Sequence, residues 1–272
     1  MTTAQLALRP HVTVKVLKYE LRDVMRSRAL MAYGAFFLVT ADALLRFGGA
    51  DPRALLGLMN IVLLVIPLVA VVFGTMYVYH AREFVEVLLA QPVARRQLFA
   101  GLYLGLALPL VAAFVLGLAI PATVHGAWAP TLRSTLVTLL GVGAVLTAVF
   151  TALALFIAVR VEDKVRGLGL AVALWLGAAV LYDGVVLLVA TMFAEYPLER
   201  PLLALMLANP VDLARVVLLL EFDVSALMGY TGAVFQRFFG STGGRAIAAG
   251  ALAMWIAVPV WLGARAFRRK DF

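Results

Sequence analysis

The chain has 272 residues, of which 64% are hydrophobic and only 14% are charged. This composition excludes an ordinary soluble domain, and several apolar runs exceed the roughly 18 residues that separate a membrane span from a buried core helix. The formal net charge of +8 does not indicate nucleic-acid binding, because the basic residues stand at the ends of apolar segments, where anionic lipid headgroups supply the counter-charge.

The N-terminal segment comes first. Residues 1–12 lack the basic and apolar regions of a cleavable signal peptide, so we expect the first apolar segment to remain in the mature chain. Residues 14–28 place apolar side chains beside a basic stripe at helical spacing, which predicts a helix lying on the cytoplasmic leaflet. The alternative is an ordinary basic flank of the first span. The stripe consists of Lys15, Lys18, Arg22 and Arg26.

Six segments are long and apolar enough to cross a membrane. Because every backbone polar group must be satisfied within lipid, the predicted fold class is all-α, a bundle of six transmembrane helices. Prolines within or near the spans are expected to kink the helices without breaking them. The expected spans are Ala29–Phe47, Leu55–Tyr79, Leu98–Val124, Ser134–Val159, Gly167–Phe193 and Ala246–Ala264.

The distribution of Lys and Arg indicates the orientation of these spans. Sixteen of the 23 basic residues fall on the side that holds both termini and the second and fourth loops. Since cytoplasmic loops carry the excess of basic residues, we expect both termini in the cytoplasm.

The loop at residues 80–97 reads HAREFVEVLLAQPVARRQ. Helical spacing predicts Phe84, Val87 and Leu88 on one face, with Glu83 and Glu86 on the other. A short, charged helix at the cytoplasmic surface suits docking on a soluble partner. The alternative is a solvated turn between two spans.

Ionisable groups within spans are costly to insert and are kept for a structural or functional reason. Asp42 lies one helical turn before Arg46, and we expect a local ion pair or a headgroup contact there. Asp183 has no basic residue within a turn and must face protein or water. Asp183, Tyr182 and Asn60 are therefore candidates either for a transport path or for structural hydrogen bonds between helices.

A stretch of about fifty residues, 195–245, follows the fifth span on the predicted outer side. Asn209, Pro210 and Asp212 form a strong helix start, with a side-chain cap, proline at the first helical position and an acid in the first turn. The apolar run that follows is too short to cross the bilayer. We therefore expect a re-entrant or interfacial helix.

Catalytic motifs are missing. There is no G-x-x-x-x-G-K-[ST] loop, so this chain does not hydrolyse nucleotide, and no H-E-x-x-H or G-x-S-x-G motif of an intramembrane hydrolase. There is no cysteine, and the methionines are typical packing residues of an apolar chain. We expect neither an enzyme, nor a metal site, nor a cofactor bound by this chain.

The arrangement of elements resembles the membrane subunit of an ABC type 2 transporter. The stretch REFVEVLLAQPVARRQLFAGLYLG at residues 82–105 carries the resemblance, through an acid, a Leu-rich turn, a Pro-Val pair, two adjacent arginines and a Gly-containing helix start. The sequence departs from the family pattern at Phe84 and Val85, which replace the usual Gly-Thr before the second acid.

The resemblance implies a type V exporter-like permease that forms a homodimer in a bacterial cytoplasmic (inner) membrane. Two copies of a separate cytoplasmic ATPase would bind the ATP and Mg²⁺. Residues 82–97 would be the coupling helix that seats in the ATPase, residues 14–28 the connecting helix, and 195–245 a cap over the exit or a platform for a periplasmic partner. The implied coupling residues are Arg82, Glu83, Glu86, Gln91, Pro92, Arg95 and Arg96.

Three further blocks narrow the resemblance: EDKVRGLGLAVALWLGAAVLYD at 162–183, NPVDLAR at 209–215 and the ending ARAFRRKDF. They are similar to the branch of permeases that serves nitrous oxide reductase maturation in denitrification. That branch implies export of copper or a sulfur species to the periplasm. Two alternatives remain open: a mechanotransmitter that relays ATPase motion to a periplasmic partner without moving solute, and an exporter of a lipid or another amphiphile.

Overall fold

The computed structural model describes residues 24–49, 51–89, 94–193, 199–222 and 241–269, and all regular structure within these ranges is helical. Lys15, Lys18 and Arg22 of the predicted surface helix, and Gln91 and Pro92 of the predicted coupling helix, lie outside them. The helices are α2 (Arg28–Gly48), α3 (Pro52–His80), α4 (Arg82–Leu89), α5 (Arg95–Val124), α6 (Pro130–Arg160), α7 (Lys164–Leu176), the π-helical turn η1 (Gly177–Leu181), α8 (Tyr182–Met192), α9 (Glu199–Leu207), α10 (Pro210–Glu221) and α12 (Thr242–Arg269).

Within the described ranges, six helices are long and apolar enough to cross a membrane: α2, α3, α5, α6, the continuous segment α7–η1–α8, and α12. They coincide with the six predicted spans, so the all-α transmembrane fold is confirmed. Each extends a few residues beyond the predicted apolar core, because helix boundaries follow local caps as well as hydropathy. The prolines at positions 67, 109, 121 and 259 lie inside helices that continue through them, as expected.

Side-chain caps fix several of the helix starts. Ser27, Asp51 and Asp163 each accept a hydrogen bond from a backbone N–H in the first turn of the helix that follows. Such caps satisfy donors that have no partner within the helix. The polar residues between the apolar runs therefore set where each span begins.

The helix α6 is central to the bundle and packs against α3, α5, α10 and α12. Its contact with α3 is close because position 74 is glycine: a Cβ on Gly74 would lie 2.8 Å from the Cβ of Ala154. In the same way, a Cβ on Gly117 of α5 would lie 2.9 Å from the Cβ of Phe37 on α2. Small residues let helix backbones approach closely. The van der Waals contacts made at this short distance help to drive helix association in lipid.

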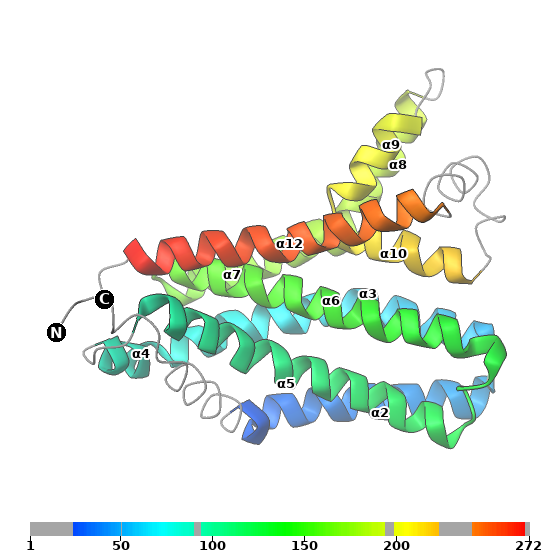
Figure 1. Ribbon diagram of the computed structural model, residues 1–272, viewed down its shortest axis with the longest axis horizontal. Coiled ribbons are helices and arrows are strands. Elements are labelled where there is room, and N and C mark those ends of the chain that lie inside the picture. Colours follow the sequence, from blue (N-terminus) through cyan, green and yellow to red (C-terminus); the bar gives the residue numbers. More distant parts are fainter. Residues whose placement is uncertain (1–23, 50, 90–93, 194–198, 223–240, 270–272) are drawn as a thin grey trace.

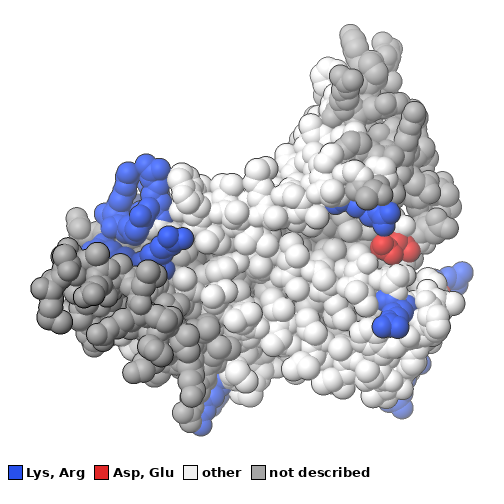
Figure 2. Space-filling view, viewed as in Figure 1, with Lys and Arg blue, Asp and Glu red and all other residues white. Residues whose placement is uncertain are grey.

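The two ends of the bundle differ in charge. The helix α2 begins and α12 ends toward the end of the bundle where α4 lies (Figure 1). We call this the basic end, because α6 finishes in Arg160 and α12 finishes in Arg268 and Arg269. Figure 2 shows Lys and Arg at both ends of one face, with uncharged side chains over its middle. The opposite end, where α10 finishes and α12 begins, is called the far end.

The short helices α9 and α10 meet at a bend of 108°. Their junction abuts the fifth span, while α8 and α9 project from the bundle (Figure 1). The end of α10 and the start of α12 lie together at the far end, since Glu221 and Arg245 line one cavity. A bent pair of this kind is either a broken span or a re-entrant loop, so the re-entrant helix stays a prediction.

Candidate coupling surface and charged hairpin site

The helix α4 forms a short surface element between α3 and α5, with one face on the core and one face outward. Val85 is buried, whereas Glu83 and Glu86 are exposed and Val87 is 62% exposed. Val87, on the predicted apolar face, is therefore exposed together with the two carboxylates. The outward face of α4, comprising Glu83, Glu86 and Val87, is called the α4 surface below.

Arg82 fastens α4 to the end of α6. Its guanidinium donates hydrogen bonds to the backbone carbonyl oxygens of Glu162 at 2.7 Å, Val161 at 2.9 Å and Ala158 at 3.0 Å. These carbonyls belong to the last turn of α6 and the residues just beyond it, where no helical N–H is available to them. Arg82 thus satisfies orphan acceptors and places a positive charge at the negative end of the helix dipole.

Tyr79 completes this contact from the last turn of α3. Its ring lies under the Arg82 guanidinium, with 4.4 Å from the guanidinium carbon to the ring centroid. Its hydroxyl donates to the carbonyl oxygen of Val161 at 2.9 Å. The ring covers one face of the guanidinium, and the three carbonyls accept hydrogen bonds from its edge. We refer to Arg82, Tyr79 and the end of α6 as the Arg82 clamp.

The two arginines predicted at the end of the coupling helix belong to a different element. α4 ends at Leu89, and Arg95 and Arg96 form the first turn of α5. Arg95 donates to the carbonyl oxygen of Arg268 in the last turn of α12 at 3.2 Å, and Arg96 is exposed. The prediction of one helix over residues 82–97 was therefore wrong, because a separate helix start at Ala94 precedes Arg95.

A second polar site lies where the α9–α10 junction meets the fifth span. At η1 the fifth span widens into a π-helical turn, a distortion that leaves backbone carbonyls without their usual α-helical partners. The amide nitrogen of Asn209 donates to the carbonyl oxygen of Ala178 in this turn at 2.7 Å. The Asn209 side-chain oxygen accepts from the N–H of Val211, so the same residue caps α10, as the sequence predicted.

The carbonyls at the end of α9 also receive side-chain donors. The hydroxyl of Tyr182 donates to the carbonyl oxygen of Leu205 at 2.9 Å, and the indole N–H of Trp255 donates to that of Leu207 at 3.1 Å. Irregular backbone at membrane depth is stable only when its polar groups are satisfied by protein or water. Tyr182 therefore holds the junction in place from α8, while Trp255 does so from α12.

Charge joins the same elements. Arg215 of α10 forms ion pairs with Asp183 of α8 and, at 3.2 Å, with Asp212 one turn earlier in its own helix. Asp212 is 2% exposed and accepts a further hydrogen bond from Asn209 at 3.2 Å. We call Asp183, Asp212, Arg215 and Asn209 the hairpin site. Its two carboxylates and one guanidinium leave one formal negative charge.

Sequence patterns missed Arg215, the residue that joins this site. Asp183 has no cation in its own helix, but the fold supplies one from thirty-two residues further along the chain. An arginine three residues after Asp212 within an apolar helix is a usable signal, because such a cation needs a partner within the bilayer. Asn60 has a local partner instead: its amide donates to the carbonyl oxygen of Leu56 in α3.

Asp42 also has a different partner from the one predicted. Its carboxylate lies 2.8 Å from Nε2 of His125, the residue at the C-terminal cap of α5. Among the described residues, the side-chain partner of Asp42 is His125, and the expected pair with Arg46 is absent. Because α2 and α5 pack together, this contact across helices replaces the one along the helix.

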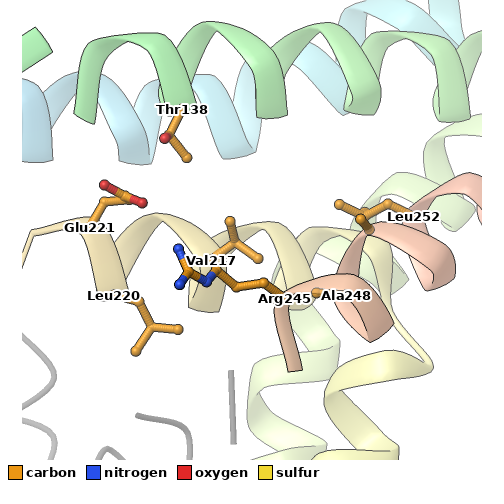
Figure 3. A pocket seen from close by; sticks show the side chains of 8 residues that line it. Thr138, Val217, Leu220, Glu221, Arg245, Ala248 and Leu252 are labelled. Carbon is orange, nitrogen blue, oxygen red and sulfur yellow. The ribbon is translucent and has the colours of Figure 1, made fainter. Parts of the chain in front are cut away.

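Two cavities flank α10. One, of about 430 Å³, lies between α6, α10 and α12 and is lined by Thr138, Glu221, Arg245 and Leu252 among others. Figure 3 shows the side chains of Glu221 and Arg245 reaching toward one another along α10, with Thr138 on the opposite wall. The other, of about 270 Å³, is lined by the charged residues of the hairpin site and by aliphatic side chains. α10 therefore divides the far end into two small spaces.

Within the described part of the chain, no three His, Asp or Glu side chains converge as a metal site requires. The chain has no cysteine to supply a thiolate. The charged groups of the far end are instead paired with each other or placed along cavity walls.

Comparison with known proteins agrees with this architecture. The family described as ABC-2 family transporter protein matches residues 14–272. The chain is 28% identical over 265 residues to the probable ABC transporter permease protein NosY of Pseudomonas aeruginosa, covering 92% of this chain and 93% of that protein. It is 27% identical over 272 residues to the protein of the same name from Stutzerimonas stutzeri, covering 91% and 92% of the two chains.

Proposed function

The chain belongs to the ABC-2 family of transporter proteins, and we propose that this permease subunit is driven by a separate cytoplasmic ATPase that docks on the α4 surface. The observation that carries the proposal is the form of α4. It exposes Glu83, Glu86 and Val87 outward, while Arg82 fixes it to the end of α6. A charged face with an apolar centre suits recognition by a soluble partner.

The fold provides a route for the resulting movement. A push on α4 reaches α6 through the Arg82 clamp, and α6 packs against α10, which carries the hairpin site. The route therefore runs from the basic end to the far end through one helix. The excess of arginine at the basic end supports its placement in the cytoplasm.

The test is reversal of charge on the α4 surface. The double variant Glu83→Lys/Glu86→Lys should insert and elute like the wild-type chain, but should lose the ATPase that co-purifies with the wild type in mild detergent. The matched control, Arg53→Glu/Arg133→Glu, reverses two exposed charges at the far end and should keep that ATPase. Undiminished co-purification by the Glu83/Glu86 variant would overturn the docking assignment.

We further propose that the permease is a homodimer with the fifth span at its seam. Only 6% of the most apolar stretch of α7–η1–α8 is buried within the chain, against 72% for α6. Asp183 lies on this span, and its side chain stays 47% exposed despite the ion pair with Arg215. A carboxylate left partly open on a membrane helix favours a protein neighbour over lipid.

The absence of cysteine from the sequence makes the dimer testable by single-cysteine cross-linking. Leu187→Cys and Leu188→Cys, which are 66% and 57% exposed in the single chain, should yield a disulfide-linked dimer in membranes. Leu116→Cys on α5, equally exposed at 57%, is the control and should stay monomeric. Cross-linking at position 116 alone would place the seam elsewhere.

We propose export of copper or a sulfur species for maturation of periplasmic nitrous oxide reductase as the transport activity. The support is similarity over nearly the whole chain to two proteins named as probable NosY permeases. The hairpin site, with its net negative charge and adjoining cavity, is the candidate for the path. Residues 195–245 would then meet a periplasmic partner.

The second candidate function is transmission of motion without solute movement. The observation in its favour is that hydrogen bonds with α8, η1 and α12 fix the α9–α10 junction. Labelling of Val186→Cys, which lines the cavity at the hairpin site, separates the two. Nucleotide-dependent access of a hydrophilic thiol reagent supports transport, and protection in every nucleotide state supports transmission.

A further inference from the structure

A third cavity lies at the basic end, between the end of α6 and the last turns of α12. Its volume is about 580 Å³, within the range of small-molecule sites. α6 and the residues just after it contribute Arg160 and Glu162, and α12 contributes Trp261, Arg265 and Arg269. This cavity is separate from the α4 surface and from the hairpin site, and it adjoins the Arg82 clamp at Glu162, whose backbone carbonyl accepts from Arg82.

The charge of the cavity is strongly positive. Three guanidinium groups and one carboxylate line it, which leaves a net formal charge of +2. Arginine binds phosphate through paired, parallel N–H donors. A group of arginines around one space therefore suits a phosphate ligand. Figure 2 shows a group of basic side chains at this end of the molecule and others at the far end.

Two of these arginines are held in position by aromatic rings. The guanidinium carbon of Arg265 lies 5.5 Å from the ring centroid of Trp261, and that of Arg160 lies 5.8 Å from the ring centroid of Phe156. Stacking of this kind restrains a long side chain at little cost to its hydrogen-bonding capacity. The cationic wall is thus partly ordered before any ligand arrives, which reduces the entropy lost on binding.

An apolar stripe leads from the cavity toward the middle of the bundle. Met254, Val258 and Trp261 follow one another at helical spacing on α12 and are 60%, 45% and 57% exposed. Their side chains can lie along acyl chains, with the tryptophan at headgroup depth, where indole rings concentrate. A positive cavity at the end of such a stripe matches a molecule with an anionic head and an apolar tail.

We propose that this cavity binds the phosphodiester headgroup of an anionic phospholipid, with Arg160 and Arg265 as its principal ligands. A free phosphate would use the same guanidinium groups but not the apolar stripe. Basic pockets between membrane helices on the cytoplasmic side are suited to such headgroups. The site is distinct from the basic surface helix predicted at residues 14–28.

The test uses the full chain, purified in detergent and stripped of lipid, with titration by phosphatidylglycerol followed by native mass spectrometry. Arg160→Gln/Arg265→Gln should bind about tenfold more weakly or worse, because two phosphate-binding cations are lost. The control Arg53→Gln/Arg133→Gln removes two exposed arginines at the far end and should bind like the wild type. Phosphatidylcholine should bind far more weakly to all three chains.

Two further measurements keep the outcome decisive. Ala266→Leu narrows the cavity without changing a charge and should also weaken phosphatidylglycerol binding. Inorganic phosphate should fail to compete; effective competition would show that the ligand is a free phosphate and would overturn the lipid assignment. Wild-type affinity in folded Arg160→Gln/Arg265→Gln and in Ala266→Leu would overturn the site itself. None of these measurements needs the ATPase.

Discussion

Arg215 on α10 forms an ion pair with Asp183 on α8, and this contact ties α10 to the fifth span beside the hydrogen bonds of Asn209 and Tyr182. In the sequence, Asp183 is an isolated carboxylate in an apolar helix. Its partner, Arg215, follows the α9–α10 junction in the chain. Asp183, the candidate for a transport path, therefore also holds two helices together. Movement at the hairpin must loosen or carry this pair.

Loss of Arg215 should destabilise the protein more than loss of Asp183. Arg215→Gln leaves two carboxylates without their cation, including Asp212, which is 2% exposed, and removal of one partner from a buried pair costs about 3 kcal/mol or more. Asp183→Asn leaves the Arg215–Asp212 pair intact. Thermal unfolding in detergent, followed by tryptophan fluorescence, should rank the melting temperatures as wild type, Asp183→Asn and then Arg215→Gln. The opposite order of the two variants would contradict the proposed geometry.

The Arg82 clamp should be needed for coupling but not for docking. Arg82→Ala removes three hydrogen bonds to the end of α6 and frees α4 from the core. The variant should retain the ATPase on co-purification, while stimulation of its activity by the permease falls. Arg82→Lys should behave similarly, because an ammonium group lacks the planar fork that contacts three carbonyls.

Spin labels in the otherwise cysteine-free chain provide the structural readout for that prediction. One label on the exposed position Glu86→Cys and one on Arg166→Cys of α7 report on the position of α4. The distance distribution should broaden in Arg82→Ala. A distribution as narrow as that of the wild type would show that other contacts, such as burial of Val85, suffice to hold α4.

Glycine at position 74 should be required for the contact between α3 and α6. Gly74→Ala would bring its new Cβ to 2.8 Å from the Cβ of Ala154, and overpacking of this kind costs about 1–3 kcal/mol. Gly141→Ala on α6 is the matched control, since a Cβ there meets nothing within 4 Å. The melting temperature should fall for Gly74→Ala and stay the same or rise for Gly141→Ala, because alanine favours a helix over glycine by about 1 kcal/mol.

The Asp42–His125 pair should contribute little by comparison. Its side chains are 43% and 21% exposed, and ion pairs open to solvent contribute about 0–1 kcal/mol. A double-mutant cycle with Asp42→Asn and His125→Gln should therefore give a coupling energy of about 1 kcal/mol or less. A much larger value would mean that the pair controls how the end of α2 meets the end of α5.

The sequence located the spans because length and hydropathy are local properties of the chain. Six helices appear where apolar runs exceed the thickness of the bilayer, and all six predicted spans are present. The start of α10 was predictable for the same reason: Asn209 accepts from a backbone N–H two residues away, and Pro210 follows it directly. A helix cap depends only on the residues of the helix that it begins, and these are adjacent in the sequence.

Side-chain partners that lie on other helices could not be predicted from the sequence in the same way. Helical spacing predicted that Phe84, Val87 and Leu88 share a face, but it did not show that the position of α4 on the bundle buries Val85 and exposes Val87. Arg46 is one turn from Asp42, yet the packing of α5 beside α2 brings His125 to the carboxylate. Spacing along a helix shows which residues share a face, and it does not show what lies opposite that face.

The sequence by itself determined the class of the molecule, its six spans and the cap that begins α10, because each depends on neighbours within a few residues. Only the tertiary structure decided that Arg82 binds the end of α6, that Asn209 satisfies a carbonyl freed by the π-helical turn, and that Arg215 pairs with Asp183. The physical reason is that a membrane bundle must satisfy every buried polar group, and it draws the partners from whichever helices the packing brings together.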